Sequence, residues 1–196
     1  MKFRPILILI ILLAFLSAGF YLTGIFHQHA KASVLPVYND ITEFQLTDST
    51  QKKVTLNDLK GKVWIADFIF TTCGGICPVM SKNMASLHRS YNLMSDVAFV
   101  SISVNPDTDT PEVLAAYAKK LKADTSKWHF LTGSSDEIRD IAVKSFKLGS
   151  MEEPIFHSGY FTLVDRKARI RGYYDGTQQK DVEKLFKDIA HLLKEK

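Results

Sequence analysis

The chain has 196 residues, of which 46% are hydrophobic and 23% charged, a composition that predicts one globular domain with its own core and a short appendage. Its formal net charge of +4 comes from Lys and Arg residues scattered along the chain, so we expect no nucleic-acid partner. The only two cysteines, Cys73 and Cys77, are too few for a disulfide framework, and their closeness in the sequence points to chemistry more than to cross-linking.

The first predicted element is a membrane anchor over residues 1–26. The segment from Pro5 to Phe26 carries no charge, and as a helix it would be about 33 Å long, enough to cross the hydrocarbon core of a bilayer. Lys2 and Arg4 precede it, so the positive-inside rule leaves the amino terminus in the cytoplasm. We therefore expect a single-pass protein of the bacterial cytoplasmic membrane whose domain lies on the extracytoplasmic (periplasmic) side.

A cleaved signal peptide is the alternative, because Ala30-Lys31-Ala32 resembles a small-x-small cleavage site. The apolar run exceeds the ~7 to 15 residues usual for a signal core, which favours the uncleaved anchor. Both interpretations export the domain. Residues 27–40 mix small and polar residues with Pro36 and are predicted to be a tether, in which His27 and His29 are solvated.

The domain, residues 41–196, is predicted to alternate strands and helices. The runs 63–70 and 98–104 are almost wholly apolar, as strands covered on both faces require. Pro78 and Pro111 each open a helix, since proline suits the first helical turn. The other predicted elements are a hairpin over 44–56, a helix capped by Ser134 and Glu137, a hairpin over 161–173 and a last helix over 182–193. This order predicts an α/β fold with a mixed sheet flanked by helices, and the closing hairpin and helix match the thioredoxin-like arrangement.

Cys73 and Cys77 lie just past the carboxyl end of a predicted buried strand, at the amino terminus of a helix. Open α/β sheets place their sites there, and a helix amino terminus favours the thiolate over the thiol. The intervening residues allow both sulfurs to face one metal ion or to join as a redox-active disulfide, whereas a structural disulfide would close too short a loop to add much stability. Soft thiolates favour Cu(I), and an added imidazole also suits Cu(II), but position alone does not select one of the six histidines.

Asp67 interrupts the apolar strand six residues before Cys73. Thioredoxin-like reductases keep a buried acid there that helps to move a thiol proton, and burial raises the pKa of a carboxyl group. Asp67 is therefore a candidate proton acceptor for the cysteine pair, and a plain hydrogen-bonded or rim residue is the alternative. Met80 and Met84 lie one helical turn apart and are interpreted as core residues rather than copper ligands.

The most specific pattern in the chain is carried by four segments, Phe70–Pro78, Ser103–Glu112, Trp128–Gly133 and His157–Ser158. Together they resemble the Sco (SenC-type) family of copper proteins that serve cytochrome c oxidase assembly. The resemblance implies a thioredoxin-like fold, copper held by Cys73, Cys77 and His157 as Cu(I) or Cu(II), and delivery of that copper toward the binuclear copper centre of the oxidase. It also implies the amino-terminal membrane anchor, a copper-receiving oxidase subunit as partner, and a copper donor or a thiol reductase as a further partner.

Two features depart from the family pattern. Asn105 stands where family members usually carry an acidic residue, although Asp109 is retained, and Gly74-Gly75 replaces the proline-containing loops common in the family. Copper affinity is expected to differ accordingly. The alternative function is a thiol–disulfide oxidoreductase that reduces the cysteines of an oxidase subunit before metallation. A peroxidase is disfavoured, because Thr71-Thr72-Cys73 is similar to a peroxiredoxin loop but lacks the matching upstream proline.

Overall fold

The computed structural model describes Ser17, residues 34–149 and residues 158–195. The chain divides into two units, Met1–Val34 and Leu35–Lys196, and the second is the folded domain. The anchor predicted over 1–26 lies outside the described residues, apart from Ser17. Within the described part of the chain, no helix is both long enough and apolar enough to span a bilayer.

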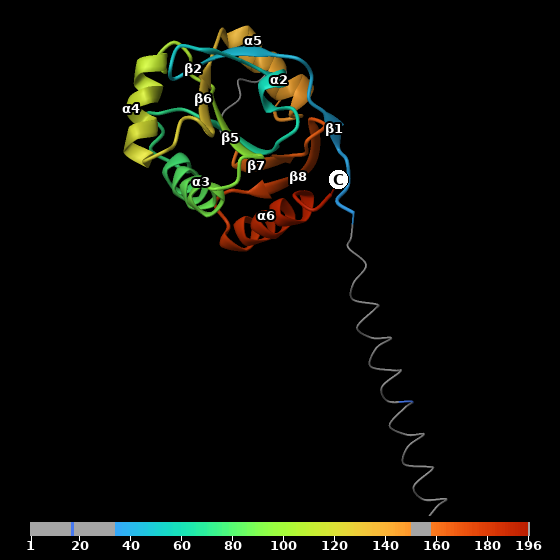
Figure 1. Cartoon of the computed structure of the whole chain (residues 1–196). Helices are drawn as coiled ribbons and strands as arrows, with labels where there is room; N and C mark the ends of the chain where they lie inside the picture. The colour runs from blue at the N-terminus through green and yellow to red at the C-terminus, as the bar shows by residue number, and fades with distance from the viewer. Residues whose placement is uncertain (1–16, 18–33, 150–157, 196) are drawn as a thin grey trace, which may run out of the picture. The chain divides into compact units, whose positions relative to one another are not determined.

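The described residues of the domain form one mixed sheet of eight strands in the order β1-β8-β7-β4-β5-β6-β2-β3 (Figure 1). Strands β4, β5 and β6 run parallel to one another, and the other pairings are antiparallel. The strands are β1 Asn39–Asp40, β2 Gln45–Asp48, β3 Lys53–Thr55, β4 Val63–Ile69, β5 Val97–Ser103, β6 Trp128–Thr132, β7 Tyr160–Val164 and β8 Arg169–Asp175. Because β4 and β5 are parallel neighbours, their carboxyl ends meet at one edge of the sheet.

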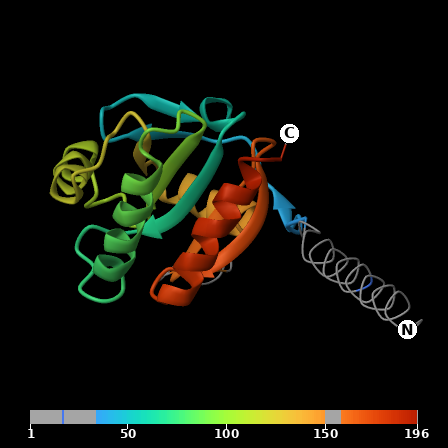
Figure 2. The ribbon, with the colours of Figure 1, turned by 60° about the horizontal axis from the view of Figure 1, so that its bottom comes forward.

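Helices cover both faces of the sheet, as predicted (Figures 1 and 2). One face packs against α3, α4 and α6, and the other against α2, α5 and the π-helical turn η1. The bounds are α2 Leu56–Leu59, α3 Cys77–Tyr91, α4 Pro111–Leu121, α5 Ser135–Asp140, η1 Ile141–Ser145 and α6 Gln179–Leu192. Strand β4 divides its side chains between the two cores, with Ile65 and Ile69 in the first and Trp64 and Phe68 in the second. Its seven residues are all buried, which confirms a strand covered on both faces.

The predicted helix starts are confirmed by their caps. Pro78 stands in the first turn of α3, where its missing N–H costs nothing. The Thr110 hydroxyl accepts a hydrogen bond from the backbone N–H of Val113 at the start of α4. Ser134 and Glu137 form the capping box expected at the start of α5. The local sequence therefore places the first turn of each of these helices.

The boundary between tether and domain differs from the prediction. The predicted tether extends to residue 40, but Leu35 is buried in the first core and Asn39–Asp40 form β1 against β8. The guanidinium of Arg171 donates to the carbonyl oxygens of Leu35 at 2.7 Å and Pro36 at 3.1 Å. The folded unit thus begins at Leu35, because pairing and a buried arginine distant in the sequence hold this segment.

Candidate metal and thiol site

The cysteine pair lies in the loop that joins β4 to α3, at the carboxyl edge of the parallel strands. Cys73 is 8% exposed and Cys77 is 3% exposed, and both are in the thiol form. Cys77 is the first residue of α3, so the pair lies where the helix presents its unsatisfied backbone N–H groups. The predicted placement of the two sulfurs at a strand end and helix start is confirmed.

The buried carboxylate of Asp109 holds this loop in place. Its Oδ2 accepts hydrogen bonds from the Thr71 backbone N–H at 3.0 Å and from the Ser103 hydroxyl at 2.6 Å. Its Oδ1 accepts from the Thr71 hydroxyl. Asp109 is fully buried and joins the end of β5 to the loop two residues before Cys73. In the sequence Asp109 is distinguished only as a retained motif residue, and the structure shows that it positions the loop.

The pKa values of the two thiols are shifted in opposite directions. Burial alone would raise the pKa of the Cys73 thiol, but hydrogen bonds from the Cys77 thiol and from the backbone amides of residues 75–77 outweigh burial and lower that pKa. Burial raises the pKa of the Cys77 thiol, and so does the hydrogen bond that it donates to Cys73. Cys73 is therefore the sulfur that first becomes a thiolate, which is the form that attacks disulfides and binds metals.

Asp67 is buried beneath α3, on the same face of β4 as Ile65 and Ile69. The hydroxyl of Ser101 donates to Asp67 Oδ1 at 2.6 Å, and the indole N–H of Trp128 donates to that hydroxyl at 2.9 Å. Asp67 Oδ2 is also buried and has no hydrogen-bond partner among the described residues. Burial raises the pKa of Asp67 to about 7. Its negative charge, when present, raises the pKa of the Cys77 thiol, so the two groups are electrostatically linked.

His157, the predicted third copper ligand, lies within residues 150–157, outside the described residues. The chain resumes beside the cysteine loop: a Cβ built at Gly159 would lie 3.4 Å from Ile76 Cδ1, and Ile76 stands between the two cysteines. The carbonyl of Gly159 accepts a hydrogen bond from the backbone N–H of Gly176 at 2.8 Å. Within the described residues, no group of three or more His, Cys, Asp and Glu side chains is arranged to hold a metal ion.

Two other histidines and the two methionines of α3 have contacts of their own. His88 packs edge-on against Phe99, and His129 Nδ1 faces the carboxylate of Asp48 at 3.9 Å. Met80 and Met84 are buried in the first core, which confirms their interpretation as packing residues.

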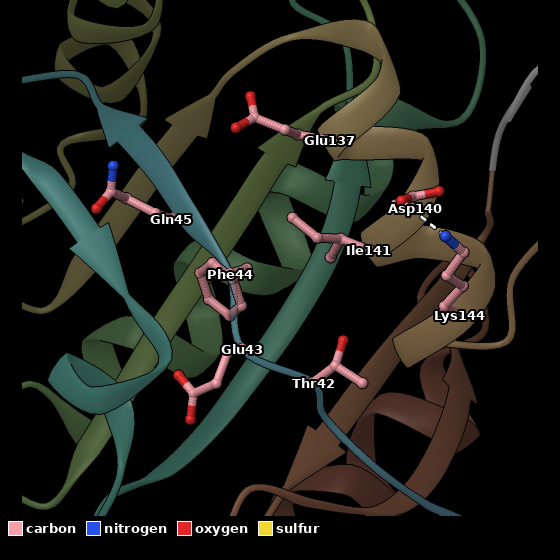
Figure 3. A pocket seen from close by; sticks show the side chains of 8 residues that line it. All are labelled: Thr42, Glu43, Phe44, Gln45, Glu137, Asp140, Ile141 and Lys144. Atoms are coloured by element: carbon pink, nitrogen blue, oxygen red, sulfur yellow. Dashed lines mark hydrogen bonds and ion pairs between the residues drawn. The ribbon is translucent and has the colours of Figure 1, made fainter.

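A groove of about 310 Å³ lies between residues 42–45 and the α5–η1 segment (Figure 3). Its three carboxylates already have partners: Glu137 caps α5, Asp140 pairs with Lys144 at 2.8 Å, and Glu43 pairs with Lys60 at 2.7 Å. The groove contains neither cysteine and offers no unpaired carboxylate to a ligand.

The mixed sheet, the covering helices and a buried dithiol at a helix amino terminus define a thioredoxin-like thiol protein. The SCO1/SenC family model matches residues 37–194, so the chain belongs to the SCO1/SenC family. This confirms the resemblance predicted from the sequence.

Solved structures of family members show the same fold. A SCO1/SenC family lipoprotein from Bacillus anthracis is 37% identical, with a TM-score of 0.71, over 80% of this chain and 96% of that one. BsSco, described as a member of the Sco family of cytochrome c oxidase assembly proteins with a disulfide switch, is 32% identical with a TM-score of 0.73, over 83% and 99%. Arabidopsis thaliana ScoI, solved with copper bound, is 28% identical with a TM-score of 0.64, over 78% and 97%. The thioredoxin-like fold class predicted from the sequence is thereby confirmed.

Proposed function

We propose that this chain binds copper and delivers it to the binuclear copper centre of cytochrome c oxidase during assembly of that enzyme. The observation that carries the proposal is the pair of buried thiols, one of them with a lowered pKa, at the junction of β4 and α3. Copper is known in the family, since Arabidopsis thaliana ScoI was solved with copper bound. The assembly role is supported by BsSco, a member of a family of cytochrome c oxidase assembly proteins.

We assign the copper ligands as Cys73, Cys77 and His157. The two sulfurs are soft donors suited to Cu(I), and an imidazole completes a set that also accepts Cu(II). His157 is two residues before Gly159, so its Cα is within about 7.6 Å of the Gly159 Cα. Gly159 lies so close to Ile76 that an added Cβ would be 3.4 Å from Ile76 Cδ1, and this proximity to the cysteine loop supports His157 as the third ligand.

Copper is the cargo in this proposal, and the residues of the chain prepare the donors for it. The amides of residues 75–77 stabilise the Cys73 thiolate, so this sulfur gives up its proton more readily than Cys77 when copper binds. Cys77 holds its proton more tightly, and the proton must leave before its sulfur becomes a ligand. Asp67 lies beneath the same helix and is electrostatically linked to Cys77, which makes it the candidate acceptor for that proton.

The membrane anchor and the extracytoplasmic location belong to the same proposal. They rest on the uncharged segment from Pro5 to Phe26 and on Lys2 and Arg4 before it. An anchored domain would meet an oxidase subunit that lies in the same membrane. The copper-receiving subunit is then the principal partner, and a copper donor or a thiol reductase would act before it.

Copper binding should depend on the redox state of the cysteine pair. Only the dithiol supplies two thiolates, so oxidation to the disulfide should abolish tight binding. The measurement is a Cu(II) titration of the detergent-solubilised chain, followed by thiolate-to-copper charge-transfer absorption and by metal analysis. We expect an equimolar complex with intense bands for the reduced chain and no retained copper for the oxidised chain. Equal stoichiometry in the two states would contradict the dithiol site.

A thiol–disulfide oxidoreductase is the second candidate function. The observation that favours it is Asp67, whose unpartnered buried oxygen and raised pKa suit a group that takes up and returns a thiol proton. The same cysteine pair would then reduce the cysteines of an oxidase subunit before metallation. Exchange needs the two sulfurs and a proton acceptor, but no imidazole ligand.

Replacement of His157 by Ala separates the two candidates. The change removes one proposed ligand and neither sulfur, so copper affinity should fall by at least ~10 to 100-fold, the usual cost of a change in the outer shell alone. The Cu(II) spectrum should change as well, while the dithiol should still reduce a disulfide substrate. Affinity from competition with a copper chelator and oxidase activity in cells are the measurements. An oxidoreductase would instead keep full oxidase assembly with His157→Ala and lose it with Asp67→Asn.

A further inference from the structure

The loop between the cysteines contains two adjacent glycines, Gly74 and Gly75, which are both exposed. Neither has a positive φ, since the positive-φ glycines among the described residues are Gly61 and Gly149. Their backbone conformation is therefore one that alanine also adopts. Backbone conformation therefore does not explain glycine at either position, and the space that a side chain would occupy is the remaining difference between them.

That space differs between the two glycines. A Cβ at Gly75 would lie 3.9 Å from Cys73 Sγ, and within the described residues no other atom outside its chain neighbours comes within 4 Å. A Cβ at Gly74 would meet nothing described within 4 Å. The amide of Gly75 also donates a hydrogen bond to the Cys73 sulfur. Residue 75 thus passes alongside the sulfur, and because it has no side chain the cysteine loop itself does not cover that flank of Cys73.

The chain segment that carries the two cysteines is uncharged and partly apolar. Residues 68–81 contain no Asp, Glu, Lys or Arg. Val79, on the first turns of α3, is 47% exposed. Tyr160 is equally exposed, and it directly follows Gly159, where an added Cβ would touch Ile76. Exposed apolar side chains around a buried thiol suit the surface of another protein more than a small charged thiol.

We propose that Gly75 determines access to the site: its bare backbone leaves the opening through which a sulfur ligand of a protein partner reaches copper bound at Cys73 Sγ. The inference deepens the proposed function and rests on it. In transfer by ligand exchange, a bond from the partner's thiolate to copper forms as the bond from Cys73 Sγ to copper breaks, and the oxidation state of copper does not change. A methyl group at position 75 would stand beside Sγ and obstruct that approach.

The test compares Gly75→Ala with Gly74→Ala, two identical changes in one loop of which only the first contacts the sulfur. The probe is 5,5′-dithiobis(2-nitrobenzoate), added to the reduced, detergent-solubilised full chain. The Cys73 thiolate attacks its disulfide, a protein–probe disulfide forms, and thionitrobenzoate leaves and is measured by its absorption. Gly75→Ala should slow this reaction by about tenfold, as ~1.4 kcal/mol added to the activation free energy would do. Gly74→Ala should react within about twofold of the parent.

Two further measurements keep the outcome unambiguous. The pH midpoint of the reaction should be the same in parent and Gly75→Ala, because the amide that stabilises the thiolate is retained. Iodoacetamide, which is smaller, should be slowed less than the aromatic disulfide. Equal slowing by both substitutions, a shifted midpoint, or a rate like that of the parent would each overturn the proposal. Copper titration of the parent chain tests the proposed function separately, so a failure there is distinguishable from a failure of the access role.

Discussion

Replacement of Arg171 by Met should lower the free energy of unfolding by about 3 kcal/mol, the order expected when one partner of a buried ion pair is removed. The Arg171 side chain is 2% exposed and binds the carboxylates of Asp165 at 3.0 Å and Glu195 at 2.8 Å. It also donates to the carbonyls of Leu35 and Pro36, so Met would leave the buried Leu35 carbonyl and the part-buried Pro36 carbonyl without this donor. Tryptophan fluorescence during urea unfolding is a suitable measurement, because both tryptophans, Trp64 and Trp128, lie in the domain core.

Arg169→Met is the matched control for Arg171→Met. Arg169 lies on the same strand and also pairs with Asp165, but its side chain is 33% exposed, so its loss should cost less than about 1 kcal/mol. Equal losses of unfolding free energy in the two variants would contradict the stabilising role of the buried Arg171 ion pairs.

The ion pairs of Arg171 with Asp165 and Glu195 should also weaken in acid. The hydrogen bond from Arg171 lowers the pKa of Glu195 in the folded chain. Burial would raise the pKa of Asp165, but hydrogen bonds from Arg169 and Arg171 lower it. A lowered folded-state pKa gives stability that is present above the unfolded-state value, about 4, and is lost as the pH falls further. The difference in unfolding free energy between the parent and Arg171→Met should therefore become smaller below about pH 4.

Most elements of the fold could be predicted because their signals are local. The apolar run that became β4 began at the predicted residue, Val63, and the helix expected at Pro78 begins one residue earlier. β1 could not be predicted, because two residues carry no periodicity and their pairing depends on β8. The burial of Arg171 is not visible in the sequence, since arginine is almost never fully buried unless it is paired, and two of its partners, Glu195 and Leu35, are far away in the sequence.

The residues of the candidate site that have a local sequence signal could be predicted, and those that depend on strand pairing could not. Cys73 and Cys77 could be placed because a strand end and a helix start are visible in the sequence around them. Asp67 could be singled out because a charge interrupts an apolar run. Its hydrogen bond with Ser101 could not be predicted, because it depends on the register between β4 and β5. Asp109 is 38 residues from Thr71, and the pairing of β4 with β5 is what brings the two together. His157 was selected by family resemblance, since no local pattern distinguishes it from the other histidines.

Asp67→Asn should make the domain more stable than the parent at pH 8. In the folded chain burial raises the pKa of Asp67 from 3.8 to about 7, so the folded state prefers the protonated carboxyl. The stability that depends on this proton is fully present below the unfolded-state pKa and is lost as the pH rises through about 7. The difference between the folded-state and unfolded-state pKa corresponds to about 4 kcal/mol of stability lost at high pH, at about 1.36 kcal/mol per pKa unit. Asn cannot ionise, so the variant avoids this loss.

Urea unfolding of the reduced chain between pH 4 and pH 8.5 measures this effect. The parent should lose stability across that range, whereas Asp67→Asn should lose much less, so that the two curves diverge as the pH rises. Asp140→Asn is the control, because Asp140 is an exposed partner of Lys144 and its loss should change stability by at most about 0.5 kcal/mol at any pH. Parallel curves for parent and Asp67→Asn would show that Asp67 does not titrate in this range. The carboxyl could not then accept the Cys77 proton near neutral pH, and the oxidoreductase candidate would lose the observation that favours it.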